Sequence, residues 1–264
     1  LNKKIGIKGV DYWYQYLDKR IVGHKNIIND LLDVNLDFRK TTSLNDNFFR
    51  RITRKFIYSR GHFDYIKFKY FSTKKKHDVI YKDPFLLLNT INLALRKNIK
   101  ILVIVRHPVA IYNSLISKNW NFDLTELYAQ KELSETLLSK INVDVNNKNE
   151  AIAFLWTQLY KHIINNKNKN VFIVTHEELS LDPFKIINQI SSFLELPTNK
   201  NLEKFINKNF FNKNIKSKNN KVHDYKRDSK QLAWNWKQSY CKEYKIIEEI
   251  CQEGLRCFYP DMYK

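Results

Sequence analysis

The chain has little glycine, with 5 in 264 residues, where average usage is about 7%. No segment has the G-x-x-x-x-G-K-[ST] spacing whose backbone N–H groups cradle the phosphates of ATP or GTP. Gly6 and Gly9 stand near a lysine, but they lack that spacing and a preceding strand. A P-loop kinase would also need a magnesium-binding aspartate after a strand. The sequence therefore disfavours this class.

Cysteines are few, and long apolar runs are missing. Cys241, Cys251 and Cys257 lack zinc-site spacing and have no histidine partners nearby. We predict buried thiols on a C-terminal helix, and leave a disulfide open for an oxidising compartment. No apolar run has the length of a membrane span, and no signal-peptide pattern follows Leu1. We therefore expect a soluble chain, whose start at Leu1 leaves open a native start further upstream.

Acidic residues are outnumbered, with Asp+Glu 27 against Lys+Arg 46 and a formal net charge of +19. Such an excess attracts polyanions such as nucleic acid, anionic membrane, sulfated glycan or a nucleotide. Hydrophobic residues at 43% and aromatics at 14% indicate a folded globule rather than a basic tail. Nucleic-acid binding stays an alternative, although no motif of that class is present.

One segment combines a buried strand with a turn suited to an anion. Ile101–Val105 is an apolar, mostly β-branched run, which is typical of a parallel strand covered on both faces. Arg106 follows the strand, and Pro108 can begin a helix whose free N–H groups favour negative charge. Ser114 adds a hydroxyl about two helical turns further on. These residues predict a phosphate site.

The same residues resemble a known family. Arg106, Pro108 and Ser114 are similar to the 3′-phosphate-binding element of sulfotransferases that use 3′-phosphoadenosine 5′-phosphosulfate (PAPS). The resemblance implies that Arg106 and Ser114 hold the 3′-phosphate of this donor, and that 3′,5′-adenosine bisphosphate is the product. The family's N-terminal Ser-Gly-Thr loop, which binds the 5′-phosphosulfate, is not found in this sequence.

A second resemblance lies at Lys82, which stands 24 residues before Arg106. We expect a strand over 78–81 and a helix from Pro84 to about Lys97, so that Lys82 and Arg106 lie at the same edge of a parallel sheet. In the family, a lysine at this spacing polarises the transferring sulfuryl group. Asp83 is a candidate general base, or else a cap of the following helix.

Further along, a helix over 150–164 and a strand over 170–175 precede His176-Glu177-Glu178-Leu179. This segment resembles the family's Tyr-Glu-Asp-Leu, in which the tyrosine lies near the adenine. His176 stands at the tyrosine position, and a stacking role and a structural role are equally open. Asp182 and Pro183 are an N-cap and a first helical residue.

The C-terminal third contains a basic aromatic segment. We expect a mobile polar loop over 199–221 and one closing helix over 240–258. Between them, 223–237 combines lysines and arginines with two tryptophans. The resemblance implies that a basic loop here closes over the cofactor, with Arg227, Trp236 and Lys237 as the binding candidates. In the N-terminal region we expect helices over 10–17 and 26–32.

We therefore predict an α/β fold, a three-layer sandwich with a central parallel sheet of the P-loop nucleotide-hydrolase kind, in which the first strand is not found. We expect one domain, with an acceptor-side region over 1–77, a core over 78–198, a basic loop over 199–237 and a closing helix over 238–264. The resemblance implies sulfuryl transfer from PAPS to a hydroxyl or amine of a glycan or small molecule, without a metal. A degenerate relative that binds nucleotide without catalysis is the alternative. The expected location is the cytoplasm, with a lumenal Golgi-type location open if an upstream anchor exists.

Overall fold

The computed structural model describes residues 11–18, 20–32, 48–49, 52, 80–96, 99–120, 123–136, 138, 142–166, 168–197, 200–210, 229–239 and 241–263. The chain divides into two compact units, and each is described by itself. The first unit comprises Leu1–Asn89 and Thr125–Thr136, and the second comprises Thr90–Leu124 and Leu137–Lys264. The prediction of a single domain stays a prediction.

Two parallel strands form the centre of the second unit. β1 (Ile101–Val105) pairs with β2 (Val171–Thr175), and the register runs from Ile101 opposite Val171 to Val105 opposite Thr175. The two predicted strands and their parallel direction are therefore confirmed. Their carboxyl ends meet at one edge of the sheet, the position at which ligands of parallel sheets bind.

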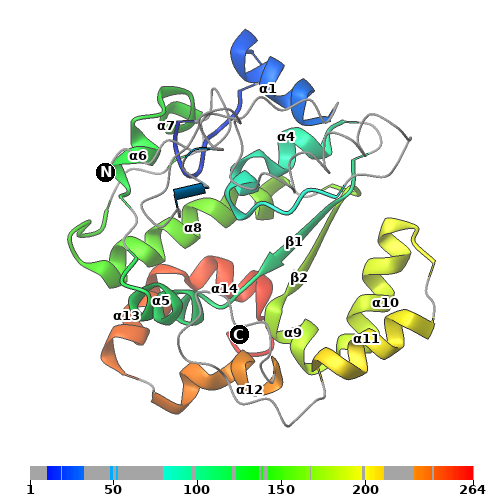
Figure 1. Cartoon of the computed structure of the whole chain (residues 1–264). Helices are drawn as coiled ribbons and strands as arrows, with labels where there is room; N and C mark the ends of the chain where they lie inside the picture. The colour runs from blue at the N-terminus through cyan, green and yellow to red at the C-terminus, as the bar shows by residue number, and fades with distance from the viewer. Residues whose placement is uncertain are drawn as a thin grey trace. The chain divides into compact units, whose positions relative to one another are not determined.

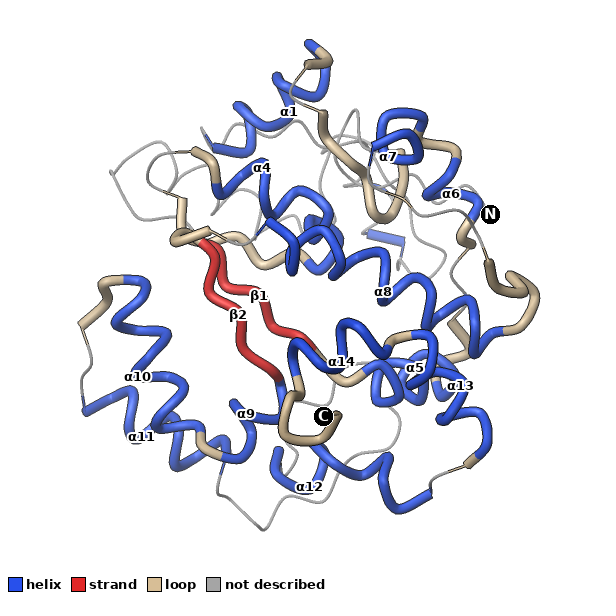
Figure 2. The backbone as a smooth tube through the Cα atoms, turned by 180° about the vertical axis from the view of Figure 1, so that it is seen from behind, coloured by secondary structure: helices blue, strands red, loops and turns tan. Residues whose placement is uncertain are grey.

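Helices flank this pair of strands on both sides (Figures 1 and 2). α8 (Lys148–Asn166) lies on one side, and its Trp156 is buried. α10 (Pro183–Leu194) covers the other side, where Phe193 stacks on Phe172 with ring centroids 5.3 Å apart. Asp182 caps α10 by accepting a hydrogen bond from the Lys185 N–H at 3.1 Å, as predicted.

Shorter helices complete the second unit. They are α4 (Thr90–Ala94), α5 (Pro108–Ser117), α9 (His176–Leu181), α11 (Lys200–Phe210), α12 (Ser229–Trp234), η2 (Asn235–Ser239), α13 (Lys242–Ile250) and α14 (Gln252–Phe258). Figure 1 shows the end of the chain close to the carboxyl ends of β1 and β2, and the view from behind in Figure 2 agrees. The last residues are thereby placed beside the predicted site.

Two predictions for this half of the chain are wrong. The expected loop over 199–221 contains α11, because Leu202 and Ile206 recur at helical spacing and Ile206 is buried. The expected closing helix over 240–258 is two helices, α13 and α14, which separate at Cys251. Gly254 follows the break and packs so closely on Trp156 that a Cβ atom there would lie 2.5 Å from the indole ring.

The first unit is helical in its described residues. α1 (Val22–Leu32) contains the predicted helix over 26–32 and begins four residues earlier. The other elements are η1 (Pro84–Asn89), α6 (Thr125–Tyr128) and α7 (Lys131–Thr136). The predicted helix over 84–97 is thus a 3₁₀ turn followed by the short α4.

The predicted helix over 10–17 is wrong for the described residues 11–17, which form a turn and a loop that two buried amides hold in place. The Asn89 Oδ1 accepts from the Leu17 N–H at 2.7 Å, and the Gln130 Oε1 accepts from the Tyr16 N–H at 2.7 Å. These partners satisfy backbone donors that a helix would have bonded to its own carbonyl groups.

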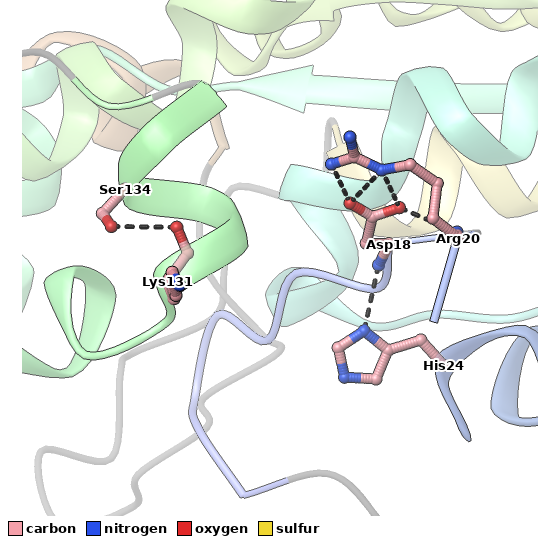
Figure 3. A network of polar contacts seen from close by, with 5 residues as sticks. All are labelled: Asp18, Arg20, His24, Lys131 and Ser134. Carbon is pink, nitrogen blue, oxygen red and sulfur yellow. Dashed lines mark hydrogen bonds and ion pairs between the residues drawn. The ribbon is translucent and has the colours of Figure 1, made fainter. Parts of the chain in front are cut away.

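Beyond this segment, Asp18 and Arg20 form a forked ion pair, and the Asp18 N–H donates to the His24 Nδ1 at 3.1 Å (Figure 3). The hydrogen bonds and charge of Arg20 lower the pKa of the buried Asp18 carboxyl. Figure 3 also shows the Ser134 hydroxyl, which donates to the Lys131 carbonyl inside α7 at 3.0 Å. These local contacts help to fix the loop before α1 and the turn of α7.

The predicted strand over 78–81 is not borne out in its described half. Ile80 and Tyr81 are not in a strand, and Ile80 is 86% exposed. Side chains of a strand inside a parallel sheet are mostly covered, and Ile80 is not. The remaining residues of the predicted strand lie outside the described part of the chain.

The structure also tests the expectations about buried thiols and membrane-spanning segments. Cys251 is buried, Cys241 is half-buried and Cys257 is exposed, and all three are free thiols. The prediction of buried thiols therefore holds for Cys251 and is wrong for Cys257. Among the helices that the structure describes, none is both long and apolar enough to cross a membrane.

Candidate functional site

The turn after β1 is the centre of the candidate site. Arg106 leaves the strand, His107 is the N-cap of α5, and Pro108 is the first helical residue. Within the described residues, the His107 side chain makes no capping hydrogen bond to α5. The first N–H groups of this helix are therefore not capped by their own N-cap side chain, and an anion suits this position. The Arg106 carbonyl accepts from the Trp156 Nε1 at 3.0 Å, which fixes the turn against α8.

His107 itself is fully buried and contacted from three directions. Its backbone N–H donates to the Glu177 Oε1 at 3.3 Å, and its Nε2 lies 2.8 Å from the Tyr263 hydroxyl oxygen. Its ring stacks on Trp236 at 4.1 Å between centroids with 14° between the planes. Residues distant in sequence thus fix the residue between Arg106 and Pro108.

The protonation of His107 follows from these contacts. Burial, and then the charge of Lys237, lower the pKa of His107 to about 3, so the imidazole is neutral. The Tyr263 hydroxyl uses its single hydrogen to donate a hydrogen bond to the Glu248 Oε1 at 2.5 Å. His107 therefore carries its proton on Nε2 and donates it to Tyr263. Among the described residues, the buried Nδ1 of His107 has no hydrogen-bond partner.

The turn after β2 brings a second set of polar groups to the same edge. Glu177, which is 1% exposed, accepts from the Tyr259 hydroxyl at 2.7 Å as well as from His107. Burial raises the pKa of Glu177, although its hydrogen bonds and the charge of Arg106 oppose the rise. Burial and the Arg106 charge lower the pKa of His176 to about 4. The hydrogen bond from the His107 N–H to Glu177 joins the two strand ends, and the charge of Arg106 acts on both Glu177 and His176.

The segment around Trp236 closes this site from the C-terminal side. Trp236 is buried, and its Nε1 has no hydrogen-bond partner among the described residues. The Lys237 Nζ lies 4.0 Å from the Trp234 ring centroid and 3.9 Å from the Met262 Sδ. The structure thus brings together four predicted residues, Arg106, His176, Trp236 and Lys237. Arg227 lies outside the described residues.

Ser114 lies on α5, and its side chain is exposed. Its backbone carbonyl accepts from the Ser117 hydroxyl at 3.0 Å. The neighbouring Asn113 is bonded instead to the Tyr244 hydroxyl, with Nδ2 at 2.8 Å. The Ser114 hydroxyl therefore lies on the solvent side of the helix that begins at the phosphate turn.

Lys82 and Asp83 belong to the first unit, where both are exposed. The Asp83 Oδ1 accepts from the Phe85 N–H at 2.8 Å, which caps η1. Phe85 packs against Trp13 and Tyr14, and burial followed by the Asp83 charge raises the pKa of Tyr14 to about 12. The prediction that Lys82 ends a strand beside Arg106 is wrong, because Ile80, Tyr81 and Lys82 lie outside any strand. A role of Lys82 in sulfuryl transfer stays a prediction.

Sequence reasoning missed several residues of the site. They are His107, Glu177, Glu248, Tyr259 and Tyr263. His107 could have been suspected, because it stands between Arg106 and Pro108, and Glu177 because it is an acid directly after a buried strand. The two tyrosines and Glu248 carry no local signal, since their role depends on contacts across the fold.

The sulfotransferase domain model matches residues 29–256 of the sequence. The chain therefore belongs to the sulfotransferase domain family, whose fold is the α/β fold of P-loop nucleoside triphosphatases. Its members transfer a sulfuryl group from PAPS, so the chain has the domain of a PAPS-dependent sulfotransferase. No curated protein and no solved structure matches the sequence.

Proposed function

We propose that this chain binds PAPS with the 3′-phosphate at the turn between β1 and α5, and transfers the sulfuryl group to an acceptor hydroxyl or amine. One observation supports this assignment above others. Arg106 and the α5 N-terminus, which lacks a side-chain cap among the described residues, stand at the carboxyl edge of a parallel sheet. A guanidinium beside free N–H groups suits a phosphate dianion.

The surrounding groups fit an adenine nucleotide. Trp236 offers a buried indole N–H that has no partner in the described part of the chain, and such a donor favours a ligand acceptor. His176 is neutral at physiological pH, because its pKa lies at about 4, and a neutral imidazole can stack on an uncharged base or bond to it. Lys237 adds positive charge beside the Trp236 ring, with its Nζ 5.7 Å from the ring centroid. The cofactor would thus be held by Arg106, Ser114, His176, Trp236 and Lys237, with Arg227 as a further candidate.

The proposed chemistry is an in-line displacement at sulfur. PAPS supplies the sulfuryl group when bound. The acceptor oxygen or nitrogen forms the new bond to sulfur, the bond from sulfur to the 5′-phosphate oxygen breaks, and the acceptor proton passes to a general base. Lys82 would neutralise the charge that develops on the oxygens of the moving group. Asp83 is a candidate base, but its bond to the Phe85 N–H favours the capping role.

The acceptor is a hydroxyl or amine compound, and a glycan and a small molecule are the candidates. The net charge of +19 suits an acceptor that already carries acidic groups. A panel of uncharged phenols, neutral oligosaccharides and acidic oligosaccharides, each tested for uptake of sulfate from PAPS, would choose between them. Nucleotide binding without transfer to any acceptor would favour the degenerate relative instead.

Calorimetric titration at several salt concentrations tests the binding part of the proposal. We expect the protein to bind 3′,5′-adenosine bisphosphate more tightly than ATP or single-stranded DNA. Arg106→Ala should weaken bisphosphate binding by about 100-fold, because a charge-assisted pair with a phosphate is lost. Lys185→Ala, which removes an exposed cation from α10, is the matched control and should bind normally. Stronger binding of DNA with a steep salt dependence would contradict the proposal.

A further inference from the structure

The last residues of the described chain contact the phosphate turn, and nothing in the proposed chemistry accounts for them. We propose that Tyr259 and Tyr263, named here the C-terminal latch, are positioning residues that hold His107 and thereby aim Arg106 and the α5 N-terminus at the 3′-phosphate. This inference rests on the proposed function, since it names what positions that binding site.

Tyr259 acts on the backbone of the turn. Its hydroxyl donates to one oxygen of Glu177 at 2.7 Å, and the His107 N–H donates to the other oxygen at 3.3 Å. All three residues are buried, with exposed fractions of 6% for Tyr259, 1% for Glu177 and 0% for His107. Because the carboxylate is buried, the loss of the Tyr259 donor would leave it less firmly held and would weaken its hold on the His107 N–H.

Tyr263 acts on the side chain of the same residue. Its hydroxyl accepts from the His107 Nε2 at 2.8 Å and donates to the Glu248 Oε1 at 2.5 Å. The Tyr263 ring also stacks beside the imidazole, with centroids 5.9 Å apart. Two tyrosines four residues apart therefore hold one histidine, Tyr259 through the Glu177 carboxylate that accepts from the His107 N–H and Tyr263 through the His107 ring.

This arrangement has a consequence for binding. His107 directly follows Arg106 and directly precedes the first helical residue of α5, so a rotation of its backbone turns the guanidinium and the helix N–H groups away together. A shift of about 1 Å in such a group can cost a large part of its contribution to a ligand. Only the part of the affinity that comes from the 3′-phosphate should depend on the latch.

The test compares two nucleotides that differ by that phosphate. The affinities for 3′,5′-adenosine bisphosphate and for 5′-AMP are measured by calorimetry on the full chain, for wild type, Tyr259→Phe and Tyr263→Phe. The control is Ile163→Val, a buried change on α8 that lowers stability without touching the turn. Urea unfolding of each variant shows how far stability itself has changed.

We expect wild type to prefer the bisphosphate strongly, and each latch variant to lose about 5- to 20-fold of that preference, since each removes one hydrogen bond of the network that holds His107. AMP affinity should stay near the wild-type value, and Ile163→Val should keep the full preference. If wild type prefers the bisphosphate and both latch variants keep that preference, the latch is overturned while the proposed function stands. If the latch variants lose affinity for both nucleotides equally, their role is structural and the inference fails. If wild type shows no preference, the proposed 3′-phosphate site is wrong, and the latch with it.

Discussion

The phosphate turn after β1 and the Lys82–Asp83 segment are the two regions to which the sequence assigns chemistry, and they are held differently. At the turn, His107 is buried and bonded to residues 70 and 156 positions away in sequence. Lys82 and Asp83 are exposed, and the contact of Asp83 is with the Phe85 N–H two residues on. The turn is thus held by contacts with residues distant in sequence, whereas the segment proposed for transfer is held by a contact between near neighbours. Changes at the turn should therefore alter stability and binding together, and changes at Lys82 should alter turnover alone.

Glu177→Ala should give the largest effect on the turn side of this comparison. The change leaves the His107 N–H and the Tyr259 hydroxyl buried without their acceptor, at about 1–3 kcal/mol each. The variant no longer has to bury a carboxylate, which offsets part of this cost. We therefore expect a net loss of about 3 kcal/mol in unfolding free energy. Urea unfolding measures it, with the exposed Glu253→Ala as the control. A loss below about 0.5 kcal/mol would show that Glu177 does not hold the turn.

Lys82→Ala should show most clearly that the Lys82–Asp83 segment affects turnover and the phosphate turn affects stability and binding. If Lys82 neutralises charge on the moving group, kcat for sulfuryl transfer should fall by about 100-fold. The unfolding free energy and the affinity for 3′,5′-adenosine bisphosphate should be unchanged, because the side chain is exposed. Lys185→Ala serves again as the control. An unchanged kcat would remove Lys82 from the mechanism.

The buried His107 should make the turn side sensitive to acid. Its pKa is about 3 in the folded protein and 6.5 in the unfolded chain, so the unfolded chain takes up the proton first as pH falls. Stability is then lost as pH drops from about 6.5 toward 3, by about 2 kcal/mol at pH 5. Urea unfolding at pH 7 and pH 5 measures this loss, and His107→Gln should show a smaller difference between the two pH values. The same difference in both proteins would count against a neutral buried His107.

Asp83→Ala should give the smallest effect. Loss of the cap at η1 should lower the unfolding free energy by about 0.5–1 kcal/mol and change kcat by less than about threefold. Asp83→Asn should restore much of the stability, because asparagine also caps well. A fall in kcat of about 100-fold or more in both variants would instead identify Asp83 as the general base.

Local patterns explain which parts of the fold could be predicted. β1, the start of α5, β2 and the Asp182 cap are each specified by neighbours in sequence, namely an apolar β-branched run, a proline at the first helical position and a capping side chain. The segment over 10–17 has the composition of a helix, but the side chains of Asn89 and Gln130 hydrogen-bond to its backbone. These partners are distant in sequence, so no local pattern predicts them. α11 was missed because its polar composition conceals the spacing of Leu202 and Ile206.

The candidate site likewise contains residues that local sequence predicts and contacts that depend on the fold. Arg106 is adjacent to its strand, and the resemblance places Ser114, His176, Trp236 and Lys237 by motif. The contacts that fix the turn could not be predicted, since Tyr263 lies 156 residues after His107 and reaches it only through the fold of α13 and α14. The sequence thus indicates which groups bind the ligand, and the structure shows what positions them.

The central claim is that the turn between β1 and α5 binds the 3′-phosphate of the sulfuryl donor. The most direct test is the ratio of affinities for 3′,5′-adenosine bisphosphate and 5′-AMP, measured by calorimetry in wild type and in Arg106→Ala. We predict that wild type prefers the bisphosphate by about 100-fold or more and that Arg106→Ala lowers this preference by about 100-fold, because the guanidinium is the proposed charged partner of the added phosphate. An unchanged ratio in Arg106→Ala would contradict the claim.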